Sequence, residues 1–330
     1  MLSVIICTYN RDKYIYNVLE SLAENTLPAS QYEIVLIDNN CTDNTRAECD
    51  RFHQDFPTVD FRMFVETNQG LSHARNRGIK ESRGDILVYV DDDALVNKEY
   101  LQTYADFFRE HPDIDAAGGP IIPKYETEEP SWMSYYTKCL LTGYKDLGKT
   151  VREFPKNDFP GGGNAAYRSS VFEKVGLFNV NLGRKGDSLV GAEEKDIFDK
   201  MTTLGMRFFY LPNAILYHLI PEKKLSKDYF DRLTYSIGKS ERMRTLAISK
   251  QKYLQRVGLE IVKWGGRPFC VLASACVDKL QKAANCCSSA GMLQGGCLVS
   301  PKLNTLFFQT IEGVAFRKGN AMPFLLIQYP

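Results

Sequence analysis

Residues 86–93 read Ile-Leu-Val-Tyr-Val-Asp-Asp-Asp, and this run decides the fold of the chain. Five residues that suit a buried strand are followed directly by three carboxylates. Adjacent carboxylates repel one another, and few cationic residues lie close to them in the sequence. A divalent cation would relieve the repulsion, and oxygen ligands suit Mg²⁺ or Mn²⁺, which also bind substrate phosphates. The run therefore predicts a metal–diphosphate site at the carboxyl edge of an α/β sheet.

Around this run the sequence alternates between strand and helix patterns. Strands are predicted at residues 3–7, 33–37, 59–64, 86–90 and 116–122. Helices are predicted at residues 14–22, from an N-cap at Thr42 to Phe52, at residues 71–81 and at residues 101–108. This alternation is typical of a mostly parallel, Rossmann-like sheet with helices on both faces.

Charge divides the chain into two parts. The net charge is +1, yet residues 221–330 carry 17 Lys and Arg against 7 Asp and Glu, whereas residues 1–220 are acidic. We expect a catalytic α/β domain at residues 1–225 and a basic, helical appendage at residues 226–330. A basic appendage indicates an anionic partner, such as a membrane surface.

The cysteines and the apolar runs of the sequence indicate where in the cell the protein is expected. Nine cysteines without a CxxC pair favour reduced thiols and disfavour a zinc site. The N-terminus enters a strand without the features of a signal peptide, and no window reaches the roughly 18 apolar residues of a membrane span. These features predict a cytoplasmic protein, and the basic appendage adds the hypothesis of contact with the inner face of the membrane.

Polar segments follow four of the predicted strands. They are Thr8 to Arg11, Asp38 to Asn40, Asn68 to Gly78 and Asp91 to Asp93. In a parallel sheet the ends of these strands meet at one edge, where ligands bind. Asn, Asp and Thr side chains there can pair with a base or a ribose, and arginines offset phosphate charge. The helix that opens near Gly70 is expected to offer free N–H groups to an anion.

In this order the segments resemble the family 2 glycosyltransferases of GT-A fold. The resemblance continues through Gly161-Gly-Gly-Asn164, Val175-Gly-Leu-Phe178, Gly191-Ala-Glu-Glu-Lys-Asp196 and Pro212-x-Ala-x-x-x-His218. It covers residues 1 to about 240 and leaves the C-terminal part of the chain outside it.

The resemblance implies roles for individual residues. Nucleotide binding falls to Thr8, Tyr9, Asn10, Arg11, Asp38, Gly70, Arg75, Asn76, Asp91 and Asp92. Metal binding falls to Asp93, Asp91 and His218, and contact with the donor sugar or the acceptor falls to Gly162, Gly163, Asn164 and Trp132. Glu193 and Glu194 occupy the place of the family's acidic pair, often Glu-Asp. Glu194 is the expected general base, although the longer side chain leaves open which acid acts.

The implied reaction moves one sugar from a nucleotide-sugar, most simply a UDP-sugar, to a saccharide or polyprenyl-linked acceptor. It depends on Mn²⁺ or Mg²⁺ and inverts the anomeric centre. The Gln-x-x-Arg-Trp motif of processive relatives is missing, which favours single additions in cell-surface polysaccharide assembly. No nucleic-acid partner is expected, and the oligomeric state stays open.

Three other classes of protein share some of these features. A sugar nucleotidyltransferase would need a Gly-rich loop with a basic residue after the first strand, and a dehydrogenase would need GxGxxG there. The chain has Thr-Tyr-Asn-Arg instead. A non-catalytic nucleotide-binding or scaffold protein is compatible with the same motifs. Taken singly, an acidic triplet is more often a solvated turn, and a histidine such as His218 is more often a core residue.

Overall fold

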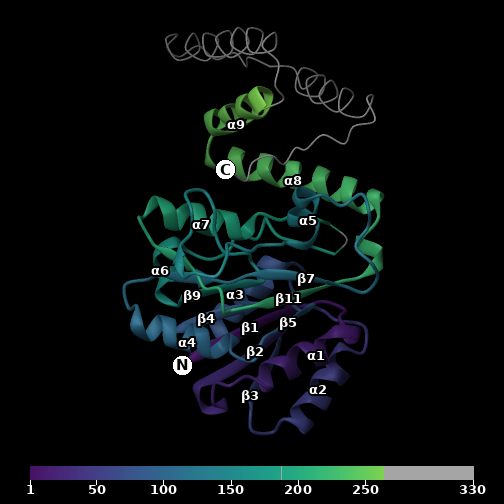
Figure 1. The fold of residues 1–330 in the computed structure, drawn as a ribbon, viewed down its shortest axis with the longest axis vertical. Helices are drawn as coiled ribbons and strands as arrows, with labels where there is room; N and C mark the ends of the chain where they lie inside the picture. The colour runs from purple at the N-terminus through teal and green to yellow at the C-terminus, as the bar shows by residue number, and fades with distance from the viewer. Residues whose placement is uncertain (187, 264–330) are drawn as a thin grey trace, which may run out of the picture. The chain divides into compact units, whose positions relative to one another are not determined.

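The computed structural model describes residues 1–186 and 188–263 (Figure 1). The chain divides into two compact units, Met1–Arg244 and Thr245–Pro330. All predicted site residues lie in the first unit. The predicted domain boundary at residue 225 stays a prediction, and the part of the predicted appendage beyond residue 263 lies outside the described residues.

The larger sheet of the first unit confirms the predicted α/β fold. Its strand order is β3-β2-β1-β4-β9-β6-β10-β8. The strands are β1 (Leu2–Thr8), β2 (Tyr32–Asp38), β3 (Asp60–Val65), β4 (Ile86–Val90), β6 (Ala116–Gly118), β8 (Arg152–Glu153), β9 (Asn164–Arg168) and β10 (Phe208–Tyr210). The first four strands in this order are parallel to one another, as expected, whereas β9 runs antiparallel to both β4 and β6. The sheet as a whole is therefore mixed.

A smaller sheet lies beside the candidate site. It joins β5 (Ala94–Val96), β11 (Leu216–Ile220) and β7 (Ile121–Tyr125). The prediction of one strand at residues 116–122 was wrong, because the chain leaves the large sheet after β6 and enters the small one at β7. A Cβ atom on Gly119 would lie 2.0 Å from the carbonyl oxygen of Ala214, and Pro120 has no N–H to donate. These two residues break the strand.

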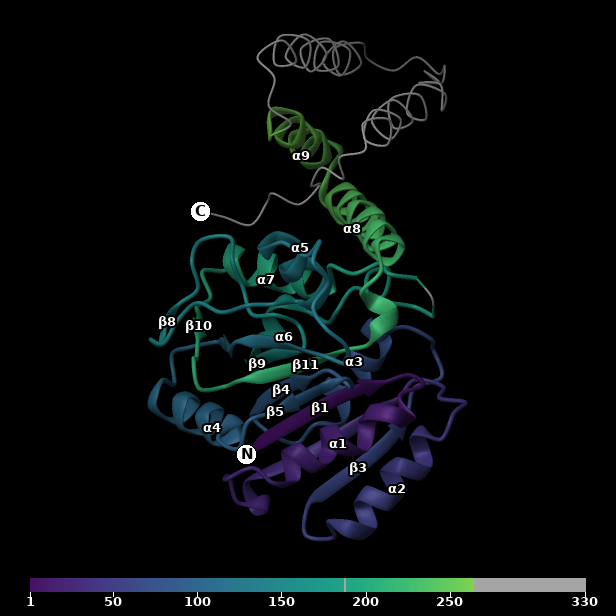
Figure 2. The same ribbon diagram turned by 45° about the vertical axis from the view of Figure 1, so that its right-hand side comes forward.

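Helices cover both faces of the large sheet (Figure 2). The described helices are α1 (Asp12–Ala23), α2 (Thr45–Asp55), α3 (Leu71–Glu81), α4 (Tyr100–Glu110), α5 (Tyr135–Thr142), α6 (Ser170–Val175), α7 (Glu193–Thr203), α8 (Lys227–Ile248) and α9 (Lys250–Lys263), with short 3₁₀ turns η1 (Ala29–Gln31) and η2 (Glu222–Lys224); α9 belongs to the second unit. Side chains of α1, α2 and α4 pack in one apolar cluster, and those of α3, α6 and α7 pack against the opposite face. Helix α2 begins at Thr45, so the predicted N-cap at Thr42 was wrong.

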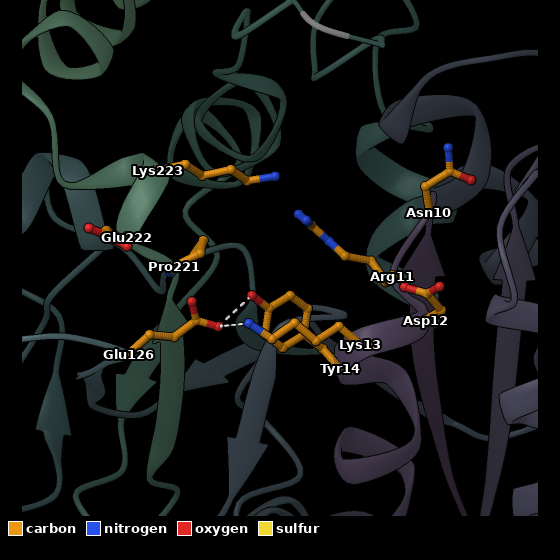
Figure 3. Close-up of a pocket in the computed structure, with 9 residues that line it drawn as sticks. All are labelled: Asn10, Arg11, Asp12, Lys13, Tyr14, Glu126, Pro221, Glu222 and Lys223. Carbon is orange, nitrogen blue, oxygen red and sulfur yellow. Dashed lines mark hydrogen bonds and ion pairs between the residues drawn. The ribbon is translucent and has the colours of Figure 1, made fainter.

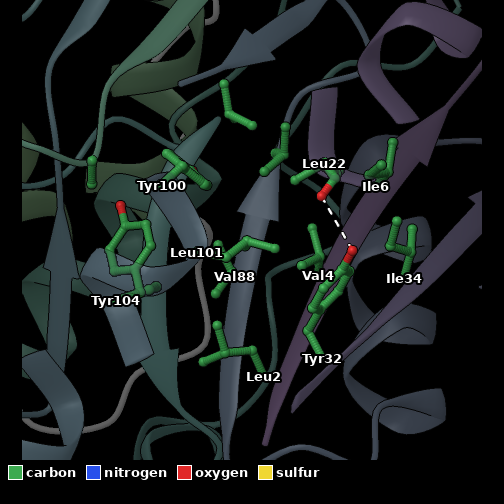
Figure 4. Packing of buried hydrophobic residues seen from close by; sticks show 14 of the residues in the cluster. Leu2, Val4, Ile6, Leu22, Tyr32, Ile34, Val88, Tyr100, Leu101 and Tyr104 are labelled. Carbon is green, nitrogen blue, oxygen red and sulfur yellow. Dashed lines mark hydrogen bonds between the residues drawn. The ribbon is translucent and has the colours of Figure 1, made fainter. Parts of the chain in front are cut away.

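The central strands are apolar on both sides because both sides are buried. Val4 and Ile6 of β1 join the cluster around α1 (Figure 4). Ile5, between them, joins the cluster around α7. The buried Tyr32 hydroxyl donates to the carbonyl oxygen of Leu22, at 3.2 Å, so its polar end is satisfied. This rigid core fixes the ends of β1, β2 and β4, where the predicted site residues follow.

Candidate active site

The acidic run after β4 lies against the end of β1. The Tyr9 backbone N–H donates to Asp92 Oδ2 at 3.3 Å, and Arg11 Nε donates to Asp92 Oδ1 at 3.0 Å. Burial raises the pKa of Asp92 to about 6, and Arg11 opposes this shift. Arg11, which lies far from the acidic run in the sequence, is thus in contact with it in the structure.

Asp93 is buried among three basic side chains. Its Oδ2 atom lies 3.0 Å from Lys224 Nζ and 3.4 Å from an Arg11 terminal nitrogen, and its Oδ1 atom lies 3.3 Å from His218 Nε2. Burial alone would raise the pKa of Asp93, but Lys224, His218 and Arg11 outweigh burial and hold that pKa well below its usual value. Sequence reasoning missed Lys224, because a lysine in a basic region gives no sign that it is buried.

The contacts of His218 allow a test of the metal prediction. Its Nδ1 atom lies 2.7 Å from the carbonyl oxygen of Thr142, which only an N–H can satisfy, so Nε2 faces Asp93. An imidazole oriented by a carbonyl and facing a carboxylate fits a divalent cation. Over residues 1–186 and 188–263, no group of three or more His, Cys, Asp or Glu side chains is arranged as a metal site. Metal binding by Asp93 and His218 stays a prediction: the chemistry of the two side chains suits it, and substrate oxygens would have to complete the shell.

Asp91 and Glu194 meet at the turn that precedes β9. A Cβ atom on Gly163 would lie 2.1 Å from Asp91 Oδ2, and one on Gly162 would lie 1.8 Å from Glu194 Oε1. A side chain at either glycine would therefore displace one of these carboxylates. The turn therefore lies beside both the edge of the predicted nucleotide site and the predicted general base.

Asn164, the next residue, holds this turn in place. Its Oδ1 atom accepts from the hydroxyls of Tyr100 and Tyr104, at 2.8 and 2.7 Å. Its Nδ2 atom donates to the carbonyl oxygens of Pro120 and Ala214, at 2.9 and 3.0 Å. The amide is fully buried and its hydrogen-bonding capacity is used. The predicted sugar contact of Asn164 is therefore corrected to a positioning role.

Arg75 binds both glutamates at the start of α7. One terminal nitrogen of Arg75 lies 3.0 Å from Glu193 Oε1 and 3.0 Å from Glu194 Oε1. The guanidinium is buried and lies over the rings of Tyr89 and Phe178, 5.6 and 5.3 Å from their centroids. In the structure Arg75 contacts the candidate base, Glu194. Contact of Arg75 with the nucleotide stays a prediction.

The two glutamates differ in access and in charge. The Glu194 side chain is 22% exposed and that of Glu193 is 3% exposed. Burial and then the neighbouring Glu194 raise the pKa of Glu193 to about 8, whereas Arg75 opposes them. Burial would also raise the pKa of Glu194, but Arg75 outweighs it and lowers that pKa below its usual value. The accessible acid is therefore the ionised one, as a general base requires.

The turn before α7 is braced by α8. The Gly191 N–H donates to Ser240 Oγ at 2.9 Å, and Lys195 pairs with Glu241 at 3.0 Å. Ala192, between Gly191 and Glu193, has a φ angle of 74°, in the left-handed region that an alanine rarely adopts. The orientation of the glutamates therefore depends on a constrained backbone and on a helix that the sequence motifs did not indicate.

The predicted base-binding loop is held by its own side chains. Asp38 is fully buried, and it accepts from the Cys41 N–H at 2.7 Å and pairs with Arg46. Asn10, with a φ angle of 54°, accepts from the Thr42 N–H at 2.8 Å. Thr8 is buried, and its hydroxyl has no hydrogen-bond partner among the described residues. These residues lie together at the ends of β1 and β2, as the sequence predicted.

Two predictions about α3 need correction. The N–H groups of Gly70 and Leu71 are not free, because they donate to Asn39 Oδ1 and to the Arg184 carbonyl oxygen, both at 2.8 Å. Asn76 exchanges two hydrogen bonds with the backbone of Phe178, at 3.0 and 2.9 Å, rather than facing the nucleotide edge. Loops distant in sequence satisfy these groups.

Trp132 packs against a small apolar cluster that includes Leu141 of α5. Its ring lies 5.8 Å from that of Phe230, and Leu141, Ile220 and Leu225 form the buried part of the cluster. Contact of Trp132 with an acceptor sugar stays a prediction. Tyr135 and Tyr136 on α5 are exposed.

Comparison with known proteins identifies the family. The model of the family described as "Glycosyl transferase family 2" matches residues 3–176, which is more than half of the chain. The chain belongs to glycosyl transferase family 2. The prediction of this family and of glycosyltransferase activity is thereby confirmed, and the coarse function is a glycosyltransferase that acts on nucleotide sugars.

This glycosyltransferase is similar to proteins whose names describe sugar transfer or polysaccharide biosynthesis. It is 28% identical over 257 residues to glucosyl-dolichyl phosphate glucuronosyltransferase of Haloferax volcanii, covering 74% of this chain and 77% of the relative. It is 25% identical over 239 residues to the succinoglycan biosynthesis protein ExoM of Rhizobium meliloti, covering 71% and 72%. A third relative, poly(ribitol-phosphate) beta-N-acetylglucosaminyltransferase TarS of Staphylococcus aureus, is 36% identical over 110 residues, covering 33% of this chain and 19% of TarS.

Solved structures share the fold. TarS of Staphylococcus aureus in complex with UDP-GlcNAc matches with a TM-score of 0.52 and 20% identity, covering 78% of this chain and 79% of that one. The mannosyltransferase PcManGT of Pyrobaculum calidifontis, in complex with GDP-Man and Mn²⁺, matches with a TM-score of 0.53 and 18% identity, covering 96% and 81%. Among the described helices of the glycosyltransferase, none is long and apolar enough to span a membrane.

Proposed function

We propose that this glycosyltransferase transfers one sugar from a UDP-sugar to a saccharide or lipid-linked saccharide with inversion of the anomeric centre. The observation that carries the proposal is the convergence of Asp91 and Glu194 on the Gly162–Gly163 turn. One carboxylate belongs to the edge where a nucleotide would bind, and the other is an accessible, ionised base. An acceptor hydroxyl between them would meet both the donor and a proton acceptor.

The mechanism assigns one step to Glu194. Its carboxylate accepts the proton of the acceptor hydroxyl while that oxygen bonds to the anomeric carbon and the bond to the diphosphate breaks. Direct displacement from the opposite face inverts the anomeric centre. Arg75 keeps Glu194 ionised and oriented, and the same terminal nitrogen of Arg75 also contacts the buried Glu193. The glycines at 162 and 163 leave room for the base to reach the acceptor.

Donor binding is assigned to the ends of β1, β2 and β4. The loop that Asp38 closes would receive the base, and Arg11 and Asp92 would border the ribose and the diphosphate. Asp93 and His218 would hold Mn²⁺ or Mg²⁺, which when bound offsets the negative charge of the leaving diphosphate as a Lewis acid. PcManGT, which shares the fold, was solved with GDP-Man and Mn²⁺.

A membrane-linked acceptor is part of the proposal. The archaeal relative is named for a dolichyl phosphate sugar, which supports a lipid-linked acceptor. Exposed Leu254 and Leu259 on α9 lie among basic residues of the same helix, a pattern typical of helices that lie on anionic membranes. The protein would then act in the cytoplasm, at the inner face of the membrane.

The test of the base uses Glu194→Gln, with Glu173→Gln on the exposed face of α6 as the matched control. A screen of nucleotide-sugars by Mn²⁺-dependent thermal stabilisation first identifies the donor. We expect Glu194→Gln to bind this donor as the unmodified protein does and to lose transfer by about 10²–10⁴-fold. Undiminished transfer by Glu194→Gln would reject Glu194 as the base.

A second test addresses the metal and separates an enzyme from a scaffold. Asp93→Ala removes the carboxylate that faces His218, so we expect Mn²⁺ together with UDP to stop raising its melting temperature. Slow hydrolysis of the UDP-sugar without acceptor should be lost in the same variant. A scaffold would show no hydrolysis in the unmodified protein.

A further inference from the structure

Two tyrosines at the start of α5 expose most of their surface. Tyr135 is 62% exposed and Tyr136 is 51% exposed. Trp132, just before the helix, instead packs against the ring of Phe230. The exposed aromatic surface of this segment therefore consists of tyrosines, and together with the half-buried Tyr144 we call them the tyrosine patch.

The rings of the tyrosine patch contact one another. The Tyr135 ring packs edge-on against the rings of Tyr136 and Tyr144, with centroids 5.7 and 6.0 Å apart. The helix that carries the first two rings has a closed N-terminus, because the Ser134 hydroxyl accepts from the Thr137 N–H at 3.3 Å. Tyrosine has few rotatable bonds, so rings held in this way lose little conformational freedom when a ligand binds.

Contacts on either side hold the segment that carries the patch. Ahead of α5, Glu126 Oε1 accepts from Lys13 Nζ at 2.5 Å and from the Tyr14 hydroxyl at 2.7 Å, and Figure 3 shows both groups directed at this carboxylate. Within α5, Leu141 is buried in one apolar cluster with Ile220. The tyrosines therefore project from a fixed support.

The C-terminal end of α5 contacts the candidate site. The carbonyl oxygen of the buried Thr142 lies 2.7 Å from His218 Nδ1. In both ribbon views α5 lies on the same side of the large sheet as α7, whose first turn carries Glu194 (Figure 1, Figure 2). Tyr144, two residues after Thr142, is thus close to the predicted metal-binding histidine.

The residue after Tyr144 links the patch to the glycine turn. Lys145 exchanges two backbone hydrogen bonds with Ile121, at 2.8 and 3.1 Å. A Cβ atom on Gly161 would lie 2.4 Å from Ile121 Cδ1, and the next two glycines lie against Asp91 and Glu194. An acceptor that presents a hydroxyl to the proposed base at this turn would place a neighbouring part of its chain beside the patch.

The charges next to the patch are paired. Lys138 and Lys145 are the lysines closest to it in the sequence; the first lies 2.7 Å from Glu129 Oε2, and the second pairs with Asp158. Neither lysine is therefore available to attract a phosphate. A tyrosine offers an apolar ring and a polar tip, which suit the C–H face and the hydroxyls of a pyranose. A polyprenyl chain would make no use of the hydroxyls.

We propose that the tyrosine patch binds an uncharged sugar ring of the acceptor, next to the ring that receives the transferred sugar. The assignment of this ring to the acceptor rests on the proposed function, whereas binding of a saccharide rests on the patch itself. Tyr135, which contacts both other rings, supplies the main stacking surface. The acceptor would then contain at least a disaccharide.

The first experiment measures binding of three uncharged probes, cellotetraose, maltotetraose and chitotetraose, by saturation-transfer difference NMR without nucleotide or metal. We expect at least one probe to bind and Tyr135→Ala to weaken it by about fivefold or more. Tyr135→Phe keeps the ring and should keep most of the affinity. Tyr235→Ala, at a tyrosine of α8 that is 64% exposed, is the matched control and should bind as the unmodified protein does. Tyr136→Ala repeats the test at the second exposed ring.

Three results would overturn the proposal: no binding of any probe, undiminished binding in both alanine variants of the patch, or equal weakening in Tyr235→Ala. A second measurement separates this proposal from the proposed function. During transfer, Tyr135→Ala should raise KM for the acceptor and leave KM for the nucleotide-sugar unchanged. An unchanged acceptor KM would reject the patch and uphold the transferase. If a probe binds through Tyr135 but no nucleotide-sugar binds the unmodified protein, the proposed function fails while the saccharide site stands.

Discussion

Arg75 is the residue on which the chemistry of the site depends most. It is buried, it contacts both glutamates, and it lowers the pKa of the one that is accessible. Its place in an Ala-Arg-Asn-x-Gly motif indicates importance but not this partner, because α7 follows more than a hundred residues later. Sequence alone could not distinguish a phosphate-binding arginine from one that positions a base.

The first residue-scale prediction concerns the pH dependence of Arg75→Met. Arg75 lowers the pKa of Glu194, so without it burial would dominate and the pKa would rise. A base with a raised pKa becomes protonated at higher pH, so the acid limb of the kcat/KM profile should move to higher pH. Arg109→Met, at an exposed position on α4, should leave the profile unchanged. A decrease in rate without a shift of the limb would argue for a purely structural arginine.

At the scale of elements, the packing of α3 against β1 can be tested at Gly78. A Cβ atom there would lie 2.4 Å from Ile5 Cγ2, although alanine is the better helix former. Gly78→Ala should therefore lower the free energy of unfolding by about 1–3 kcal/mol, measured by urea denaturation. Gly238→Ala in α8, where a Cβ meets nothing within 4 Å, should raise it by about 0.5–1 kcal/mol. Equal effects of the two substitutions would contradict this account.

Some of the strands could be predicted from the sequence alone, and others could not. Strands β1, β2 and β4 were predictable because each is a nearly continuous apolar run. The break between β6 and β7 was not, since it depends on the close approach of Gly119 to Ala214. The same holds for the site: the strand-end segments were predictable, whereas the pairing of Lys224 with Asp93 and of Ser240 with Gly191 required the tertiary structure.

At the scale of the whole molecule, the division into two units predicts separable roles. Every proposed catalytic and donor-binding residue lies within Met1–Arg244, and α8 ends at Ile248. A chain shortened to residues 1–249 should therefore fold and be stabilised by Mn²⁺ and UDP as the full chain is. It should no longer float with anionic liposomes, because it lacks α9. Flotation of the full chain, sensitive to salt, is the positive control.

Two results would contradict this division of roles. Loss of donor binding in the shortened chain would mean that the second unit contributes to the site. Undiminished flotation would mean that the membrane contact, if it exists, lies within the first unit.

Ala192 has a consequence for attempts to make this enzyme more heat-tolerant. A non-glycine residue in the left-handed region costs roughly 1–2 kcal/mol, so glycine at this position should raise the melting temperature. The same change would make the turn before α7 more flexible, and Glu193 and Glu194 follow directly after this turn. Selection for a higher melting temperature would then lower the turnover rate. At position 192 a gain in thermal stability is therefore expected to come with a loss of catalytic turnover.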